Sequence, residues 1–335
     1  MLAVKLSGNK GISLSNVEKP KLKENTAIIH VTACGICGTD VNEIYLSETG
    51  QKQTPGHEVV GIIEEIDTEY NCYSAGERVL INCHITCGKC EHCINGDLIF
   101  CPSLTAIGFD QDGGMAEYLA APYGCLRHLP DDISDEEGVL LTDALATSYS
   151  ALKKTGLSGT GGNLVVFGAG PIGINTIFCA SRLGMHVTAV DTNMKRLEEA
   201  KTFGAEYIIQ GGTVNTCKEL LNICNNRGFD AALQCTSSKQ VFTDCIAVLK
   251  NRGILVNIGI INAVSVDIYN DVTMRELQII GSRNCNDNML KEMMDFCRNN
   301  RDIKKLVTHH YPLSEAAKAY EASSRGEGLK ILIHP

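Results

Sequence analysis

The sequence predicts an α/β protein that combines a doubly wound parallel sheet with a β-rich, barrel-like domain. Beyond Gly161, short apolar runs alternate with helix-like segments, which is typical of a parallel sheet with right-handed crossovers. Before residue 144, strand-like segments such as AIIHVTA and EVVGIIEEID are separated by glycine-containing turns. We therefore expect the β-rich domain to span residues 1–144 and 284–335, and the parallel-sheet domain to span residues 145–283.

Composition narrows the classes of function. The 335 residues carry a net charge of −9 and contain no long basic run, which argues against binding to nucleic acid or to an anionic membrane surface. The opening MLAVKLSGNK lacks the apolar core of a signal peptide. The most apolar stretch, residues 164–180, is interrupted by glycines and an asparagine and does not read as a membrane span. We therefore expect a cytoplasmic protein.

The first domain contains a group of metal-type donors in separate motifs. These are CGICGTD (residues 34–40), GHE (residues 56–58) and LLTDALATSYSAL (residues 140–152). Each motif alone is a weak indication, because a lone histidine is more often structural. Together they offer a thiolate, an imidazole and carboxylates, which are the donors of a catalytic zinc site that keeps one position free.

Four cysteines with two, two and seven residues between them lie in CGKCEHCINGDLIFC. Neighbouring cysteines two residues apart reach one ion from a tight turn, and the Asn95-Gly96 pair provides such a turn. Four thiolates fill the tetrahedral shell of zinc and leave no place for substrate, so this zinc is expected to be structural. An iron–sulfur cluster or unrelated thiols are weaker alternatives. The predicted ligands are Cys87, Cys90, Cys93 and Cys101.

The remaining cysteines need another explanation. In a long chain without a signal peptide, clustered cysteines bind metal more often than they form disulfides, and scattered ones are usually small buried residues. Cys83 and His84 precede the cysteine loop and are expected to take no part in it. Burial is expected for Cys72, Cys125, Cys179, Cys217, Cys224, Cys245 and Cys297.

A nucleotide-binding pattern opens the second domain. The apolar run NLVVF precedes a G-x-G-x-x-G turn, a helix-like segment and a second strand, HVTAV. In this context the first glycine forms the turn, the second admits a pyrophosphate, and the third lets helix and strand pack closely. Amides at the helix N-terminus then face the phosphates. The turn consists of Gly168, Ala169, Gly170, Pro171, Ile172 and Gly173.

The acidic residue after the second strand indicates which dinucleotide binds. Asp191 is expected to accept hydrogen bonds from the adenosine ribose hydroxyls. A 2′-phosphate would meet a like charge there, so NAD is favoured over NADP. Lys195 and Arg196 follow closely, and their charges would soften this preference if they faced the ribose, but the pattern favours solvated residues of the next helix.

Further strands and helices continue the alternation. KRLEEAKTFGA and CKELLNICNNRG read as helices, and EYIIQ, DAALQCT, GILVNIGI and LQIIG read as strands. The loops that follow two of these strands, at residues 235–236 and at Ile258-Gly259-Ile260, are expected to border the nicotinamide. The tail contains a helix, MLKEMMDFCRNN, and a final strand, KILIHP.

The order of these motifs resembles the zinc-dependent medium-chain dehydrogenases of the alcohol and polyol dehydrogenase type. CGICGTD, GHE, the four-cysteine loop and GAGPIG follow one another, and the likeness covers essentially the whole chain. It implies a GroES-like catalytic domain, which the tail rejoins, and a Rossmann domain that binds NAD. It also implies a homodimer or homotetramer.

The resemblance implies roles for individual residues. Cys37 and His57 would bind the catalytic zinc, and Glu58 matches a glutamate that approaches or ligates the metal in relatives. Asp143 stands where relatives place a third ligand, commonly cysteine or glutamate and in some branches aspartate. Thr39 matches the hydroxyl that takes the substrate proton.

Other positions depart from the family or belong to the cofactor. Several relatives have a histidine where this chain has Asn42, which leaves the onward path of the proton open. Cys34 would be a packing residue, Thr147 would lie beside the nicotinamide, and Arg196 would touch the adenosine ribose.

The resulting hypothesis is an oxidoreductase that transfers hydride from a secondary alcohol to NAD⁺, with zinc as a Lewis acid and two zinc ions per chain. The segment GSRN at residues 281–284 resembles the tails of sugar-acid and polyol dehydrogenases, which favours a polyol, cyclitol, sugar acid or sugar phosphate. The alternatives are an NADP-dependent enzyme of secondary-alcohol or threonine type, a quinone reductase without catalytic zinc, and a zinc-containing binding protein.

Overall fold

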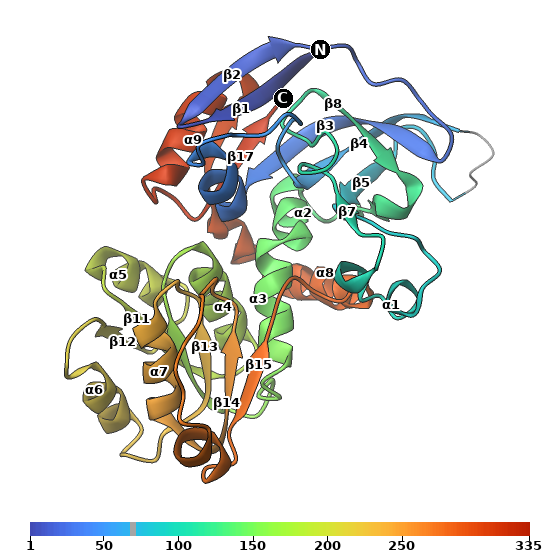
Figure 1. Cartoon of the computed structure of the whole chain (residues 1–335). Helices are drawn as coiled ribbons and strands as arrows, with labels where there is room; N and C mark the ends of the chain where they lie inside the picture. The colour runs from blue at the N-terminus through green and yellow to red at the C-terminus, as the bar shows by residue number, and fades with distance from the viewer. Residues whose placement is uncertain (68–71) are drawn as a thin grey trace. The chain divides into compact units, whose positions relative to one another are not determined.

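The computed structural model describes residues 1–67 and 72–335, and Figure 1 shows them as a cartoon. The chain divides into two compact units. Unit 1 comprises Met1–Ala146 and Asn286–Pro335, and unit 2 comprises Thr147–Cys285. One unit is rich in antiparallel strands and the other is built on a parallel sheet, so the predicted α/β fold class is confirmed.

Unit 1 is organised around strand β3, which pairs antiparallel with β4, β8 and β17 in a seven-stranded sheet. The sheet order is β16-β17-β3-β4-β5-β9, with β8 added on β3. Ile29, Ile63 and Val79 from three of these strands are buried in one hydrophobic core with Tyr320. The strands are β3 (Thr26–Ile36), β4 (Glu58–Ile66), β5 (Arg78–Ile81), β8 (Tyr118–Pro122), β9 (Leu126–His128), β16 (Val307–Pro312) and β17 (Lys330–His334).

Helix α2 places an acidic residue at a break between two helices. Ser134 caps the helix, because its Oγ accepts from Glu137 N at 3.4 Å while Glu137 Oε2 accepts from Ser134 N at 2.8 Å. The helix ends at Thr142, and Asp143 interrupts it with φ −148° and ψ −68° before α3 begins. The helical segments of this unit outside the cysteine loop are η1 (Asp40–Tyr45), η3 (Tyr123–Cys125), α2 (Asp135–Thr142), η5 (Asp287–Met289), α8 (Leu290–Asn299), η6 (Arg301–Leu306), η7 (Leu313–Glu315) and α9 (Ala316–Ser324), and α3 (Ala144–Lys153) runs on into unit 2.

Two small ribbons complete unit 1. One is the hairpin of β1 (Leu2–Gly8) and β2 (Gly11–Asn16), which pair antiparallel. The other pairs β6 (His84–Ile85) with β7 (Thr105–Ala106) and brackets the cysteine loop. The loop itself contains only short helical segments, α1 (Glu91–Ile94) and η2 (Leu98–Phe100).

Unit 2 is a six-stranded parallel sheet in the order β12-β11-β10-β13-β14-β15 (Figure 1). The chain first builds outward from β10 and then returns to the other side with β13, so the strand order reverses between these two strands. Ligands of such sheets bind outside the carboxyl ends of the strands at this point. The strands are β10 (Asn163–Phe167), β11 (His186–Asp191), β12 (Tyr207–Gln210), β13 (Phe229–Gln234), β14 (Leu249–Asn257) and β15 (Gln278–Gly281). The helices are α4 (Pro171–Arg182), α5 (Met194–Thr202), α6 (Thr216–Ile223), α7 (Lys239–Val248) and η4 (Ile268–Thr273).

Two details of the sequence interpretation were wrong. The helix expected for CKELLNICNNRG ends at Ile223, because Asn225 and Asn226 adopt left-handed φ values of 52° and 59° that asparagine tolerates. Among the scattered cysteines, Cys72 is exposed and Cys217 is only half-buried, while the other five are buried. In the part of the chain that the structure describes, no helix is long and apolar enough to cross a membrane.

Candidate active site

Four predicted donor residues of unit 1 meet in one place. Cys37 follows β3, His57 and Glu58 stand at the start of β4, and Asp143 lies between α2 and α3. One donor atom from each lies within 4.8 Å of the others. Cys37 Sγ is 3.3 Å from Asp143 Oδ2, and His57 Nε2 is 4.0 Å from the same oxygen. A thiolate, an imidazole and carboxylates in one cluster fit a zinc ion.

Asp40 lies beside the histidine of this cluster. Its carboxylate is fully buried, with Oδ1 3.3 Å from His57 Nδ1 and Oδ2 accepting from the backbone amide of Cys37 at 2.9 Å. Burial alone would lower the pKa of His57, but Asp40 and Cys37 outweigh burial and raise it well above its usual value. A carboxylate on one ring nitrogen leaves the other to face a metal. Sequence reasoning gave Asp40 no role, although it closes the CGICGTD motif.

The side chains of Thr39 and Cys37 lie close together. Thr39 Oγ1 lies 3.7 Å from Cys37 Sγ and is half-buried, whereas Asn42 is exposed. Burial raises the pKa of the Cys37 thiol, and Asp143 raises it further. Ionising this thiol therefore needs a nearby positive charge, which a bound zinc ion would provide.

A buried lysine that sequence reasoning missed contacts Glu58. Lys330 Nζ lies 2.6 Å from both carboxylate oxygens, and the two side chains are 4% and 0% exposed. Burial raises the pKa of Glu58 to about 7, although Lys330 opposes this shift. Burial would lower the pKa of Lys330, but Glu58, Cys37 and Asp143 outweigh it and raise that pKa. The sequence signal that could have pointed to Lys330 is its position as a charged residue at the start of the apolar run KILIHP.

The four cysteines of the loop also converge, with their thiols within 4.8 Å of one another. Cys90 Sγ and Cys93 Sγ are 3.4 Å apart, and Cys101 Sγ accepts from Cys87 N at 3.4 Å. The backbone amides of Lys89 and Cys90 lower the pKa of Cys87 to about 6, which favours the thiolate. Four converging thiols, one of them with a lowered pKa, fit a closed zinc site.

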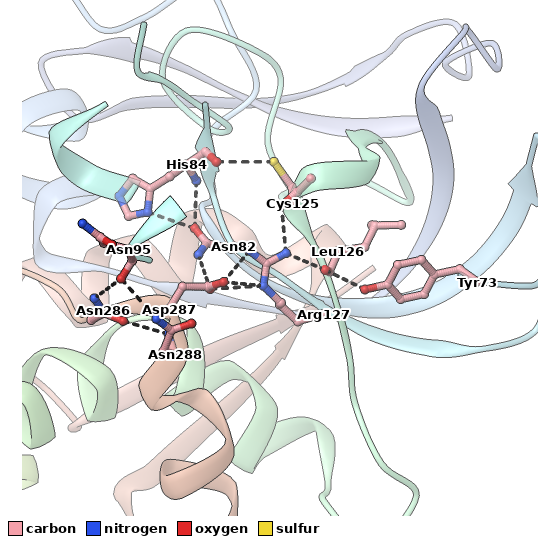
Figure 2. Close-up of polar contacts among 11 residues, drawn as sticks. Tyr73, Asn82, His84, Asn95, Cys125, Leu126, Arg127, Asn286, Asp287 and Asn288 are labelled. Atoms are coloured by element: carbon pink, nitrogen blue, oxygen red, sulfur yellow. Dashed lines mark hydrogen bonds and ion pairs between the residues drawn. The ribbon is translucent and has the colours of Figure 1, made fainter. Parts of the chain in front are cut away.

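Polar contacts tie the turn of this loop to the segment before α8. Asn286 Nδ2 donates to Asn95 O at 2.8 Å and to Asp97 Oδ1 at 2.7 Å. Asn288 Nδ2 donates to Asn95 O at 3.1 Å, and the backbone amide of Asp287 donates to Gly96 O at 2.8 Å. Residues 286–288, which we call the clip, therefore hold the loop through both side chains and backbone (Figure 2).

An ion pair anchors the clip to the sheet of unit 1. Figure 2 shows the guanidinium of Arg127 against the carboxylate of Asp287, with Nη2 to Oδ2 at 2.7 Å and Nε to both oxygens. Asn82 Nδ2 donates to the same carboxylate at 3.0 Å, and Asn82 Oδ1 also contacts His84. His84, which was expected to lie outside the ligand set of the loop, contacts Asn82 and so lies beside this support of the clip.

In unit 2 the glycine turn forms a cradle at the start of α4. Gly168 follows β10 with φ +97°, and a Cβ on Gly173 would lie 1.7 Å from Gly168 O, so only glycine fits the third position. At Gly170 a Cβ would meet nothing within 4 Å, which leaves room for a ligand beside the helix N-terminus. Pro171 opens the helix.

Asp191 stands at the end of β11 beside this turn. Its Oδ2 accepts from Ala169 N at 2.7 Å and its Oδ1 accepts from Asn193 N at 2.9 Å, so the carboxylate is fixed by backbone amides. It remains half-buried, and Arg196 on α5 is also half-buried. Each carboxylate oxygen has a further lone pair to offer. This arrangement fits the ribose end of a dinucleotide.

The other predicted cofactor positions lie in unit 2 with different exposures. Thr147 is buried, and the hydroxyl of its neighbour Ser148 donates to Ile172 O at 3.1 Å. Ile258 and Ile260 follow β14 at its carboxyl end, where Ile258 N donates to Gln234 O at 3.0 Å and Ile260 is exposed.

Two family models match the chain in succession. Residues 23–131 match the alcohol dehydrogenase GroES-like domain, and residues 171–299 match the zinc-binding dehydrogenase model. The L-threonine 3-dehydrogenase of Chromobacterium violaceum is 29% identical over 337 residues, covering 98% of each protein. The alcohol dehydrogenase TADH of Thermus sp. ATN1 is 26% identical, with a TM-score of 0.93 over 100% of this chain and 99% of that one.

A third similar protein is named as a dehydrogenase of a diol. The 2R,3R-butanediol dehydrogenase of Bacillus subtilis is 25% identical, with a TM-score of 0.89 over 100% of this chain and 99% of that one. The matches therefore extend over both units. They cover both the glycine turn of unit 2 and the clustered zinc-type donors of unit 1. On this ground the chain belongs to the zinc-dependent medium-chain dehydrogenase family and is an oxidoreductase that acts on alcohols.

Proposed function

We propose that the protein oxidises a secondary alcohol with NAD⁺ and holds two zinc ions, one for catalysis and one for structure. The observation that carries the proposal is the cluster of Cys37, His57, Glu58 and Asp143, in which His57 and Glu58 are buried and the other two are half-buried. We assign the catalytic zinc to unit 1 and the cofactor to unit 2, in line with the division expected from the sequence. The thiols of the cysteine loop hold the structural ion.

Different residues of unit 1 would contribute to removing the proton from the alcohol hydroxyl. A zinc ion at this centre supplies Lewis acidity, which lowers the pKa of an alcohol hydroxyl. Asp40 keeps His57 turned toward the centre, and Thr39 stands close enough to Cys37 to take the proton that the alcohol releases. Because Asn42 is exposed and has no acidic proton, the proton passes from Thr39 by another route.

We propose NAD rather than NADP as the cofactor. The carboxylate of Asp191 is fixed at the end of β11 by two amides, and a 2′-phosphate would meet its charge. Arg196 on α5 would contact the adenosine ribose, and Thr147, Ile258 and Ile260 would lie near the nicotinamide. Steady-state turnover with NADH and with NADPH tests this preference. A higher kcat/KM with NADPH would contradict it.

The substrate we favour carries more than one polar group. The family likeness of residues 281–284 supports a polyol, cyclitol, sugar acid or sugar phosphate. A smaller vicinal substrate is the second candidate, because L-threonine and 2,3-butanediol, named for two similar proteins, both place a polar group beside a secondary hydroxyl. A screen of both groups with NAD⁺, followed by NADH absorbance, decides between them. Failure of all of these alcohols with fully zinc-loaded protein would overturn the proposal.

We also propose that the chain forms a homodimer or homotetramer. Large apolar side chains are exposed on the part of unit 2 that follows β14 and includes the edge strand β15, which supports association through this segment. Sedimentation analysis measures the oligomeric state, and a monomer at micromolar concentration would contradict this assignment. The exposed side chains are those of Ile260, Ile268, Tyr269, Met274 and Ile279.

A further inference from the structure

The candidate zinc centre has one more donor than an open catalytic site requires. Catalytic zinc sites use three protein ligands and keep a position free, whereas structural sites use four. Cys37, His57 and Asp143 already provide three donors, and an oxygen of Glu58 lies within 4.8 Å of them. The cysteine loop has the same number of donors and is closed. The number of donors alone therefore does not determine whether Glu58 binds the metal.

Lys330 contacts Glu58 and can determine whether this carboxylate reaches the metal. Its Nζ lies 2.6 Å from both oxygens of Glu58 and 3.3 Å from the carbonyl of Ile36. The pairing of β17 with β3 sets Ile331 opposite Ile36 and so fixes the lysine beside the start of β4. On another side, a Cβ on Gly35 would lie 2.0 Å from Glu58 Oε2, so the backbone of β3 lies directly against the carboxylate.

A fully buried carboxylate requires a compensating cation. Two cations compete for Glu58 in a zinc-loaded protein, the ammonium of Lys330 and the metal itself. With both Glu58 oxygens at 2.6 Å from Lys330 Nζ, the ammonium already balances the charge of the carboxylate. Without Lys330, the zinc ion would be the nearest source of positive charge.

We propose that Lys330 is a positioning residue that holds Glu58 as its counterion and thereby keeps this carboxylate out of the zinc ligand set. The centre then has three protein ligands and one position for substrate. This inference rests on the proposed function, because it takes Cys37, His57 and Asp143 as the ligands. Loss of the lysine would turn the open centre into a closed one of the structural kind.

The first experiment replaces Lys330 and follows the metal rather than activity alone. Lys330→Met keeps most of the side-chain length but removes the charge, and Lys330→Arg is the matched control that retains it. We expect Lys330→Met to bind the catalytic zinc at least about tenfold more tightly in chelator competition, the scale of effects from residues that support metal ligands. After cobalt substitution, its visible absorption should change, while that of Lys330→Arg should match wild type. Turnover of Lys330→Met should fall.

The second experiment removes the carboxylate of Glu58. It remains informative even if Lys330→Met fails to fold. In the presence of Lys330, Glu58→Gln should change zinc affinity by less than about threefold, below the effects seen for groups that support a metal. The double variant Lys330→Met/Glu58→Gln should lose the tighter binding. A large loss of zinc affinity in Glu58→Gln alone, or unchanged affinity and cobalt spectrum in folded Lys330→Met, would overturn the proposal.

The zinc content of the wild-type protein separates this inference from the function on which it rests. The ion that disappears in Cys37→Ala identifies the catalytic centre before any change at Lys330. If wild-type protein holds no such ion, the proposed function fails first. If the ion is present and the Lys330 variants behave as wild type, only the positioning role fails.

Discussion

At the residue scale, the candidate zinc centre places ionisable groups where burial opposes their charges. The pKa of the Cys37 thiol is raised by burial and by Asp143, while Asp40 and Glu58 are fully buried carboxylates. Such groups persist in a protein interior when cations compensate them. A zinc ion and Lys330 are the cations that would compensate these buried groups. Replacing a side chain of the centre should therefore change metal binding or activity.

Replacing Cys37 should remove the catalytic ion without unfolding the protein. We expect Cys37→Ala to contain one zinc ion instead of two and to lose more than about a hundredfold in kcat/KM, since even groups behind the ligands matter by ten- to hundredfold. Cys34→Ala is the matched control, because Cys34 is fully buried in the core and lies in the same motif. Metal analysis, turnover and circular dichroism measure the outcome. Full activity of Cys37→Ala would exclude Cys37 as a ligand.

Asp230 should stabilise unit 2 in a pH-dependent manner. Burial would raise its pKa, but Lys250 and Asn163 outweigh burial and lower it, with Asn163 N donating to Oδ2 at 2.7 Å. A lowered pKa stabilises the fold above the ordinary value of 3.8, and this contribution is lost as pH falls through the folded-state value. We expect Asp230→Asn to lower the free energy of unfolding by about 1–2 kcal/mol at pH 7. Denaturation at pH 7 and near pH 3 should show this difference shrink. An equal loss at both pH values would contradict the explanation.

At the element scale, the cysteine loop is held by contacts with other segments of unit 1 as well as by the metal we propose for it. It contains only α1 and η2, which are four and three residues long. The clip of residues 286–288 supplies hydrogen bonds to its turn, and Arg127 on β9 holds the clip through Asp287. We therefore regard loop, clip and β9 as one cooperative element.

Breaking the ion pair of the clip should weaken both the fold and the metal site of the loop. Asp287→Asn loses the charge that Arg127 contacts, and we expect a cost of about 1–3 kcal/mol, because a partly buried arginine is left without its partner. Release of the loop zinc to a chelator should also become faster. Asp295→Asn on α8 is the control, since its pair with Arg298 is exposed and should contribute less than about 1 kcal/mol. Equal effects of the two substitutions would contradict the role of the clip.

At the scale of the whole molecule, the two predicted zinc ions should differ in what their removal does. In the proposed arrangement, four thiolates would close one site and three protein ligands would leave the other open, so the open site should lose its ion at a lower equilibrium concentration of chelator. We expect activity to disappear first with the circular dichroism spectrum retained, followed by a drop in melting temperature. Parallel measurement of zinc release, turnover and melting checks this order. Simultaneous loss of activity and fold would contradict it.

The sequence predicted those parts of the molecule that depend on local motifs. The glycine turn, the four-cysteine loop and the alternation of unit 2 each rest on spacing within a short segment. The catalytic donors lie in separate motifs, and their roles were inferred from the resemblance to the family. The sequence did not predict Asp40, Lys330 or the clip, because their roles depend on partners brought together only by the fold. Lys330 and Glu58 are 272 residues apart in sequence, and Arg127 and Asp287 are 160 apart. No periodicity or spacing rule relates residues at such separations.

The position of β17 has a consequence for how the protein matures. This strand adds to β3 late in the chain and brings Lys330 beside Glu58, which belongs to a strand made far earlier. A nascent polypeptide that has not yet reached residue 330 would carry the Glu58 carboxylate without its ammonium partner. Metal captured during synthesis would then meet four uncommitted donors, so the vacant coordination position would arise only after the last strand has docked.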